Sequence, residues 1–400
     1  MKNKKKLSLY IHIPFCVKKC HYCDFCSAAG DESQKAAYTE LLCREIDSWG
    51  RLLQDDYCVY TIFIGGGTPT CLNAELLKKI GNAVRTAFDC SDLIEFTMEA
   101  NPGTVTSEHL TVWKQIGVNR VSLGLQSAQN AELQILGRIH AYEQFLDTYH
   151  QVRESGIPNI NIDIMAAIPG QTMESYQDTL EKVVHLKPEH ISSYSLIVEP
   201  GTLFDSLEQS GKLERVDEET DRKMYQWTKK YLQQEGYCRY EISNYSLRAK
   251  KCIHNCVYWT GGEYLGIGVN ASSYLAGYRF RVPSSPEEYA NYIERLNERK
   301  DLKENNLKSI IMEMDEPEIS DKTSQMEEFM FLGLRMTEGI SEKEFYKRFG
   351  VSLMDVYGNV VQKYQKIGML QRIADTGRIA LTEQGIDVSN RILSDFILSE

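Results

Sequence analysis

The sequence predicts an α/β fold, in which strands and helices alternate to build a parallel sheet, followed by a smaller, mainly helical C-terminal unit. Two observations lead to this prediction. Runs of β-forming residues recur along the first half of the chain with helical periodicity between them, and the pattern changes after about residue 320. With 400 residues, 42% of them hydrophobic and 25% charged, the chain can bury a large core.

Six runs rich in β-branched and aromatic residues predict the strands. They are LSLYIHI (7–13), VYTIFI (59–64), LIEFTM (93–98), RVSLGL (120–125), INIDIM (160–165) and HISSYSLIV (190–198). Apolar spacing typical of helices separates them, at about residues 33–53, 73–88, 106–116, 129–155 and 174–186. This alternation predicts βαβ units with parallel strands.

The C-terminal unit has a different pattern. Helical spacing at about 322–335, 341–349 and 353–366 precedes a predicted hairpin at 369–382 and a last helix to Leu398. Three helices and a hairpin resemble a winged helix, a shape often associated with DNA. The unit carries ten Lys and Arg against twelve Asp and Glu, so we do not expect phosphate contacts to drive binding. The charge-rich residues 297–324 before it predict a connector or a lid.

Charge and cysteine content narrow the classes of function. A formal charge of −11 argues against broad nucleic-acid binding. His12 and Pro14 interrupt the short apolar run after the basic MKNKKK, so we expect neither a signal peptide nor a membrane span. Eleven cysteines without an export signal predict the reducing cytosol, where a disulfide framework does not persist.

Four cysteines lie together in CVKKCHYCDFCS (16–27): Cys16, Cys20, Cys23 and Cys26. All four thiolates could hold zinc, although structural zinc sites usually use two separated ligand pairs. The C-x3-C-x2-C spacing of the first three instead suits a loop around a [4Fe–4S] cluster, with one iron left open for a small molecule. Cys26 could close that position, so the cysteines alone leave both metal centres open.

Polar groups follow the predicted strands, where the active sites of such sheets collect. Gly65–Gly67 allow a ligand's polar end to approach and offer free backbone groups, while Glu99 and Asp163 suit ribose hydroxyls or an ammonium group. Arg138 could pair with a carboxylate. Together with Gln126, these residues predict a site for a molecule that carries an amino acid, a ribose and a base.

Several motifs resemble those of radical S-adenosylmethionine (SAM) proteins, in particular the oxygen-independent coproporphyrinogen oxidases and their HemW haem-chaperone relatives. They are the cysteine loop, GGGTPT (65–70), MEANPGT (98–104), LGLQS (123–127), GRIH (137–140), IPGQT (168–172), YEISNYS (240–246), HNCVYW (254–259), YLGIG (264–268) and EEFMFLGLRMTEGI (327–340). The resemblance implies a partial six-unit (β/α) radical SAM barrel over residues 1–248. An extension and connector over 249–320 and a winged-helix-like domain over 321–400 would follow.

The resemblance also implies site residues. Cys16, Cys20 and Cys23 would hold a [4Fe–4S] cluster, SAM's amino and carboxylate groups would occupy the open iron, and Cys26 would be a spectator. The residues implied for the SAM site are Tyr10, Tyr22, Phe25, Gly66, Gly67, Thr68, Glu99, Gln126, Arg138 and Asp163.

Two features resemble the haem chaperones more than the oxidases. The oxidases carry a further cysteine two residues after the third ligand, where a second SAM binds, and this chain has Phe25 there. In HemW proteins the HNxxYW motif has been linked to haem, which makes His254 a candidate haem ligand, with Cys252 and Cys256 as alternative soft ligands. The alternative for His254 is a histidine that hydrogen-bonds beside Tyr258 and Trp259.

We therefore expect a cytoplasmic haem chaperone that binds one [4Fe–4S] cluster, SAM and haem. Its expected partners are a haem-accepting protein and an electron donor for the cluster, with no nucleic acid and at most transient membrane association. The alternative is a radical SAM enzyme, acting by coproporphyrinogen decarboxylation or by radical chemistry on another substrate. The chain departs from its relatives near the expected site, at Ala166, Ala167, Asn270 and Ser272.

Overall fold

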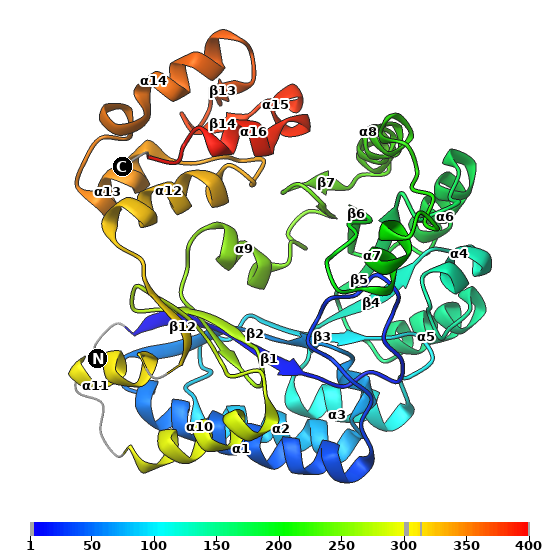
Figure 1. Cartoon of the computed structure of the whole chain (residues 1–400), viewed down its shortest axis with the longest axis vertical. Helices are drawn as coiled ribbons and strands as arrows, with labels where there is room; N and C mark the ends of the chain where they lie inside the picture. Colours follow the sequence, from blue (N-terminus) through cyan, green and yellow to red (C-terminus); the bar gives the residue numbers. More distant parts are fainter. Residues whose placement is uncertain (1–3, 300–303, 313, 399–400) are drawn as a thin grey trace.

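The computed structural model describes residues 4–299, 304–312 and 314–398, and its centre is one large curved sheet (Figure 1). Six parallel strands lie side by side in sequence order: β1 (Lys5–Ile13), β2 (Tyr57–Gly66), β3 (Glu95–Ala100), β4 (Arg120–Gln126), β5 (Ile160–Ala166) and β6 (His190–Ser195). All six match predicted strands, so the α/β prediction is confirmed.

Further strands extend the sheet at both ends. Beyond β1 lie β9 (Tyr264–Ile267), parallel to it, and then antiparallel β10 (Ser272–Leu275), β11 (Tyr278–Arg281) and β12 (Asp315–Ile319). Beyond β6 lie antiparallel β8 (Asn244–Ser246) and β7 (Cys238–Arg239). In the described part of the chain, β12 and β7 end the sheet without pairing to each other, so the barrel is partial.

The predicted connector at 297–324 is more ordered than expected. It contains a short helix, α11 (Glu304–Ile311), and the edge strand β12, while residues 300–303 and 313 lie outside the described residues. The strand was not predicted because its sequence, DEPEI, is acidic, and edge strands tolerate charged side chains.

Helices cover the outer face of the sheet (Figure 1). The predictions are confirmed for α1 (Glu32–Leu53), α2 (Ala74–Ala87), α3 (Ser107–Ile116) and α6 (Met173–His185). The single helix predicted at 129–155 is wrong: α4 (Asn130–Ile135) and α5 (Tyr142–Glu154) are separated by a turn at which Gly137 has a φ of 72°. The helices that were not predicted include α7 (Leu203–Gln209), α8 (Glu218–Gln234) and α10 (Pro286–Glu298).

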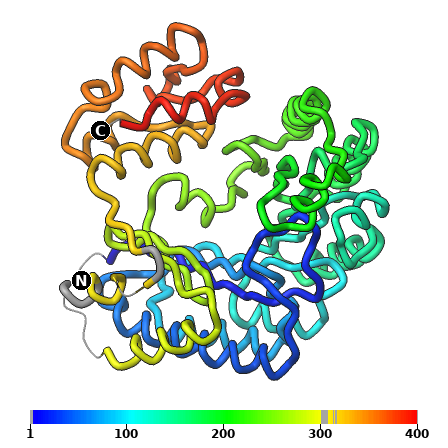
Figure 2. Tube along the Cα trace, viewed as in Figure 1, coloured from blue at the N-terminus to red at the C-terminus, as the bar shows by residue number. Residues whose placement is uncertain are grey.

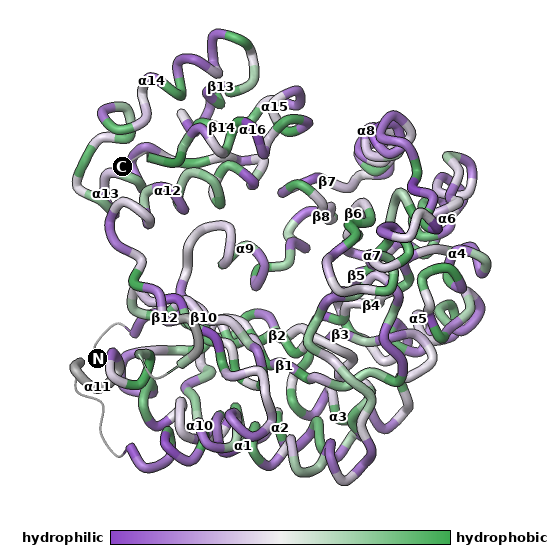
Figure 3. The backbone as a smooth tube through the Cα atoms, viewed as in Figure 1, coloured by the Kyte–Doolittle hydropathy of each residue, from purple (hydrophilic) through white to green (hydrophobic). Residues whose placement is uncertain are grey.

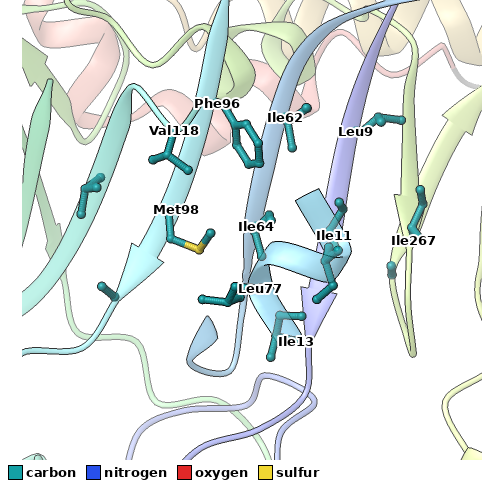
Figure 4. Close-up of a cluster of buried hydrophobic side chains, with 14 of the residues drawn as sticks. Leu9, Ile11, Ile13, Ile62, Ile64, Leu77, Phe96, Met98, Val118 and Ile267 are labelled. Atoms are coloured by element: carbon teal, nitrogen blue, oxygen red, sulfur yellow. The ribbon is translucent and has the colours of Figure 1, made fainter. Parts of the chain in front are cut away.

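Alternation along the strands separates the core from the interior of the barrel. In β1, Leu7, Leu9, Ile11 and Ile13 are all completely buried, and Figure 4 shows three of them with apolar side chains of neighbouring strands and Leu77 of α2. The intervening Ser8, Tyr10 and His12 point to the opposite face. The concave face therefore carries the polar side chains of the sheet.

The C-terminal unit has its own buried cluster, from Met326 to Phe396, and lies next to the concave side of the sheet (Figure 2). It contains α12 (Lys322–Gly333), α13 (Glu342–Phe349), α14 (Leu353–Lys366) and a hairpin of β13 (Leu370–Arg372) and β14 (Ile379–Leu381). The prediction of one last helix to Leu398 is wrong. The chain leaves helical geometry at Val388, between α15 (Glu383–Asp387) and α16 (Ser389–Ser394).

The long helices mix polar and apolar residues along their length. Figure 3 shows hydrophilic and hydrophobic residues interleaved along α1 and α14. Among the helices that the structure describes, none is long and apolar enough to span a bilayer.

Candidate functional site

A cavity of about 330 Å³ lies at the carboxyl ends of the parallel strands and collects most of the predicted site residues. The predicted residues that line it are Cys16, Cys20, Tyr22, Cys23, Phe25, Gly66, Gly67, Thr68, Glu99, Gln126, Arg138 and Asp163. The structure does not place Tyr10 and His254 on its wall.

The cysteine loop connects β1 to α1. Its ends are joined by two backbone hydrogen bonds, from the Cys16 N–H to the Ala28 carbonyl and from the Ala28 N–H to the Pro14 carbonyl, each 3.0 Å long. Cys16, Cys20 and Cys23 are free, half-buried thiols on the cavity wall. Burial raises the pKa of the Cys23 thiol, and the two neighbouring cysteines raise it further. Three free thiols on one cavity wall are the donor type that a [4Fe–4S] cluster requires.

Cys26 has a different environment from these three. Its thiol is also free and half-buried, but the residue does not line the cavity. Its carbonyl oxygen accepts a hydrogen bond from His12 Nε2 at 2.8 Å, which ties this end of the loop to β1. This position favours the prediction that Cys26 is a spectator.

The glycines after β2 serve close packing. Gly66 has a φ of 107°, and a Cβ atom on Gly67 would lie 2.7 Å from the Phe15 carbonyl oxygen. The Gly66 N–H donates to the Glu99 carboxylate at 3.1 Å and the Gly67 N–H to the Ile13 carbonyl at 2.8 Å. The N–H groups of Gly66 and Gly67 are therefore not free for a ligand as expected, and the Gly67 N–H holds the loop against β1 instead.

Glu99 and Asp163 place two carboxyl groups in the cavity. Burial raises the pKa of Glu99 to about 8, and the nearby charge of Asp163 contributes. Asp163 accepts hydrogen bonds from Ser122 Oγ at 3.0 Å and Asn161 Nδ2 at 2.7 Å, which fix its orientation. A ligand with a positive charge or with hydroxyl donors would stabilise this pair.

Gln126 ends β4 in a strained conformation. Its φ of 72° lies in the left-handed region, which non-glycine residues rarely adopt and which is often found at binding sites. Tyr194 on β6 donates its hydroxyl to Gln126 Oε1 at 2.9 Å and holds the side chain at the cavity.

Arg138 lies in the turn between α4 and α5 and reaches the cysteine loop. Its guanidinium group donates to the Gly124 carbonyl at 2.6 Å, to Asn101 Oδ1 at 2.7 Å and to Cys20 Sγ at 3.5 Å. Its Nε is buried and has no partner among the described residues, which leaves a donor for a ligand carboxylate.

The two tyrosines of the predicted set differ in position. Tyr22 lines the cavity beside Arg138, and burial raises the pKa of its hydroxyl. Tyr10 lies behind the cavity on β1, where its hydroxyl hydrogen-bonds His12 Nδ1 at 3.0 Å.

His254 is enclosed inside the barrel on α9 (Ile253–Trp259), with 1% of its surface exposed. Its Nδ1 hydrogen-bonds Thr61 Oγ1 and its Nε2 hydrogen-bonds the Tyr258 hydroxyl, both at 2.8 Å. Burial and the charge of Arg120 lower its pKa to about 3, so the ring is neutral. With both nitrogens bonded, this arrangement does not favour the prediction of a haem ligand.

The flanking cysteines are no more available to a ligand. Cys252 is completely buried, and its thiol donates to the Glu95 carboxylate at 3.6 Å. Burial raises the pKa of the half-buried Cys256 to about 12.

Sequence reasoning missed three residues that shape the site. Asn101 positions Arg138, Ser122 positions Asp163, and Tyr194 positions Gln126. Ser122 and Tyr194 lie inside predicted strands, and Asn101 directly follows β3. The signal that could have identified them is a polar side chain at an inward-facing position of a strand or at a strand end.

Comparisons with known proteins agree with this geometry. Residues 10–183 match the model of the radical SAM superfamily, and residues 321–388 match that of the HemN C-terminal domain. The chain is 36% identical to heme chaperone HemW of Lactococcus lactis over 99% of both chains. It is also 36% identical to that of Bacillus subtilis, over 98% of this chain and 99% of the relative.

The solved structure of coproporphyrinogen III oxidase (HemN) from Escherichia coli, a radical SAM enzyme, has a similar fold. It superposes with a TM-score of 0.82 over 98% of this chain and 90% of that chain, at 20% sequence identity. This similarity extends through the C-terminal unit.

Proposed function

Because the chain belongs to the HemW haem-chaperone family within the radical SAM superfamily, we propose that it binds haem and delivers it to an acceptor protein. Its cofactors are the [4Fe–4S] cluster and SAM of that superfamily. The observation that carries the proposal is Phe25 on the cavity wall. The oxidases have a further cysteine and a second SAM at this position, so Phe25 separates this site from theirs.

The geometry of the cavity supports a role for each of several residues. Cys16, Cys20 and Cys23 would hold the cluster, which supplies one-electron transfer and an open iron for SAM. The Arg138 guanidinium, whose Nε has no partner among the described residues, would donate to a carboxylate, and Glu99 and Asp163 would accept hydrogen bonds from an ammonium group or hydroxyls. These contacts orient SAM in the inner part of the cavity.

We also propose a cytoplasmic location, with an electron donor that reduces the cluster. All eleven cysteines are free thiols, which suits a reducing compartment. The haem-accepting protein is then an intracellular partner.

A radical SAM enzyme is the second candidate. One observation favours it: the inner cavity keeps a full set of groups suited to SAM, including the strained Gln126 and the unpartnered Arg138 Nε. A protein that never cleaves SAM has less need of such a site.

The test uses the full chain with its cluster reconstituted under anaerobic conditions. Haem titration should give saturable binding, and mixing with an apo-haemoprotein should transfer the haem. The same protein, reduced and supplied with SAM and coproporphyrinogen, should form no protoporphyrinogen. Many turnovers of that product would replace the chaperone proposal with the enzyme.

A further inference from the structure

The cavity has an inner and an outer part with different chemistry. The polar groups suited to SAM come from the strand ends, whereas the outer wall carries Phe25 of the cysteine loop with Leu196 and Ile197 beyond β6. Phe25 is 58% and Ile197 is 67% exposed. Large apolar side chains gathered at the rim of a site mark a surface that an apolar ligand covers.

Two lysines adjoin this apolar surface. Lys18 and Lys19 are exposed residues of the cysteine loop that also line the cavity, and Lys19 Nζ donates to the Phe25 carbonyl at 3.0 Å. Among the described residues, neither forms an ion pair with a carboxylate. We call Lys18, Lys19, Phe25, Leu196 and Ile197 the cavity mouth.

We propose that haem binds at the cavity mouth, with its macrocycle against Phe25, Leu196 and Ile197 and its propionates at Lys18 and Lys19. This inference rests on the proposed function and names the site at which that function takes place. Haem combines a broad apolar ring with two carboxylates on one edge, which matches an apolar wall bordered by two ammonium groups. Asp24 and Glu199 also line the cavity, so their charge directs the propionates towards the lysines.

Two other locations are less suited. His254 is enclosed, and both of its ring nitrogens are bonded. A hollow of about 310 Å³ beside α9 is lined by Trp259 and Phe329, but guanidinium groups already cover these rings. Arg335 lies 4.7 Å from the Trp259 ring centroid and Arg348 lies 5.6 Å from that of Phe329. In the part of the chain that the structure describes, no guanidinium group lies over the Phe25 ring of the cavity mouth.

The first test compares haem affinity, followed by absorption, in the full chain with its cluster and SAM. Ile197→Ser should weaken haem binding about tenfold through lost apolar contact, and Lys18→Glu about fivefold through charge reversal. Matched exposed controls on other surfaces, Ile367→Ser and Lys114→Glu, should bind haem as the wild type does. Iron content verifies that each variant holds its cluster.

The second test locates haem without a substitution. Haem over the cavity mouth obstructs the exit of SAM, so release of labelled SAM should slow at least about tenfold when haem is bound. An unchanged release rate, with haem bound, overturns the proposed location.

The remaining outcomes separate the location from the function. Wild-type affinity in both mouth variants, with loss in Trp259→Leu, would move haem to the hollow beside α9 and leave the chaperone proposal standing. If both mouth variants bind haem as the wild type does, but an acidic electron-transfer protein reduces their clusters more slowly, the cavity mouth is a protein-docking surface. That outcome would overturn the inference. No haem binding by the wild type would remove both proposals.

Discussion

At the scale of single residues, Glu99 shows how burial connects the site to pH. Its carboxyl group has a pKa of about 8 and is mostly protonated at neutral pH, whereas a ligand that offers donors prefers the ionised form. SAM binding should therefore release a proton and weaken as the pH falls below about 8. Between pH 6 and 7.5 the affinity should change about tenfold per unit.

Calorimetry in buffers of different ionisation enthalpy measures this proton release. Glu99→Gln should abolish the release, and Asp163→Asn should reduce it because the pKa of Glu99 falls when the neighbouring charge is removed. If the wild type and Glu99→Gln release the same number of protons on SAM binding, the proton comes from another group.

The cysteine loop leads to a second residue-scale prediction. Cys16→Ala, Cys20→Ala and Cys23→Ala should each prevent assembly of the cluster, because each removes a thiolate from the cavity wall. Cys26→Ala should assemble a normal four-iron cluster and bind SAM. Iron and sulfide analysis with absorption spectroscopy tests the set, and loss of the cluster in Cys26→Ala alone would contradict the ligand assignment.

At the scale of elements, α9 is anchored inside the barrel by its backbone N–H groups and by the His254 side chain. The Glu95 carboxylate accepts from the backbone N–H groups of Ile253 and His254, and the His254 ring joins β2 to Tyr258. The HNCVYW stretch is therefore fixed to the sheet, with His254 as its buried residue.

His254→Ala should lower the stability of the protein because it removes the partner of the Tyr258 hydroxyl and one of two partners of the Thr61 hydroxyl, and creates a cavity beside Phe63. We expect a loss of roughly 2–4 kcal/mol. Chemical denaturation measures it, and Cys256→Ala on the same helix is the milder control. The absorption spectrum of bound haem should not change, and a shift without loss of stability would restore His254 as a ligand.

Backbone conformation after β5 leads to a further element-scale prediction. Ala167 has a φ of 57°, a left-handed conformation that costs an alanine about 1 kcal/mol. Ala167→Gly should therefore raise stability by about that amount. Ala83→Gly in α2, where the backbone is helical, should lower it by a similar amount. Two variants with the same sign of effect would refute this explanation.

At the scale of the whole molecule, the sequence predicted the parts that repeat. The six parallel strands follow from their apolar runs, and the cavity follows from placing polar groups at strand ends. Elements interrupted by glycine or rich in charge were not predicted. Gly137 divides one predicted helix into two, and the acidic sequence of β12 lacks the apolar pattern of a strand. The hydrogen bond from His254 to Tyr258 agrees with the alternative drawn from the sequence, but the bond to Thr61 could not be predicted because Thr61 lies far away in the sequence, on β2.

The alternation of the strands has a consequence for variants of this protein found in genomes. In β1, substitutions at the completely buried Leu9 or Ile11 remove core packing and should reduce the amount of protein in the cell. In β5 a core residue and a cavity residue are neighbours in the sequence, since Ile162 is in the core and Asp163 faces the cavity. Substitutions at two neighbouring codons can therefore cause different defects. A chaperone or a lower growth temperature should restore the amount of protein when the core residue is changed, but neither should restore function when the cavity residue is changed.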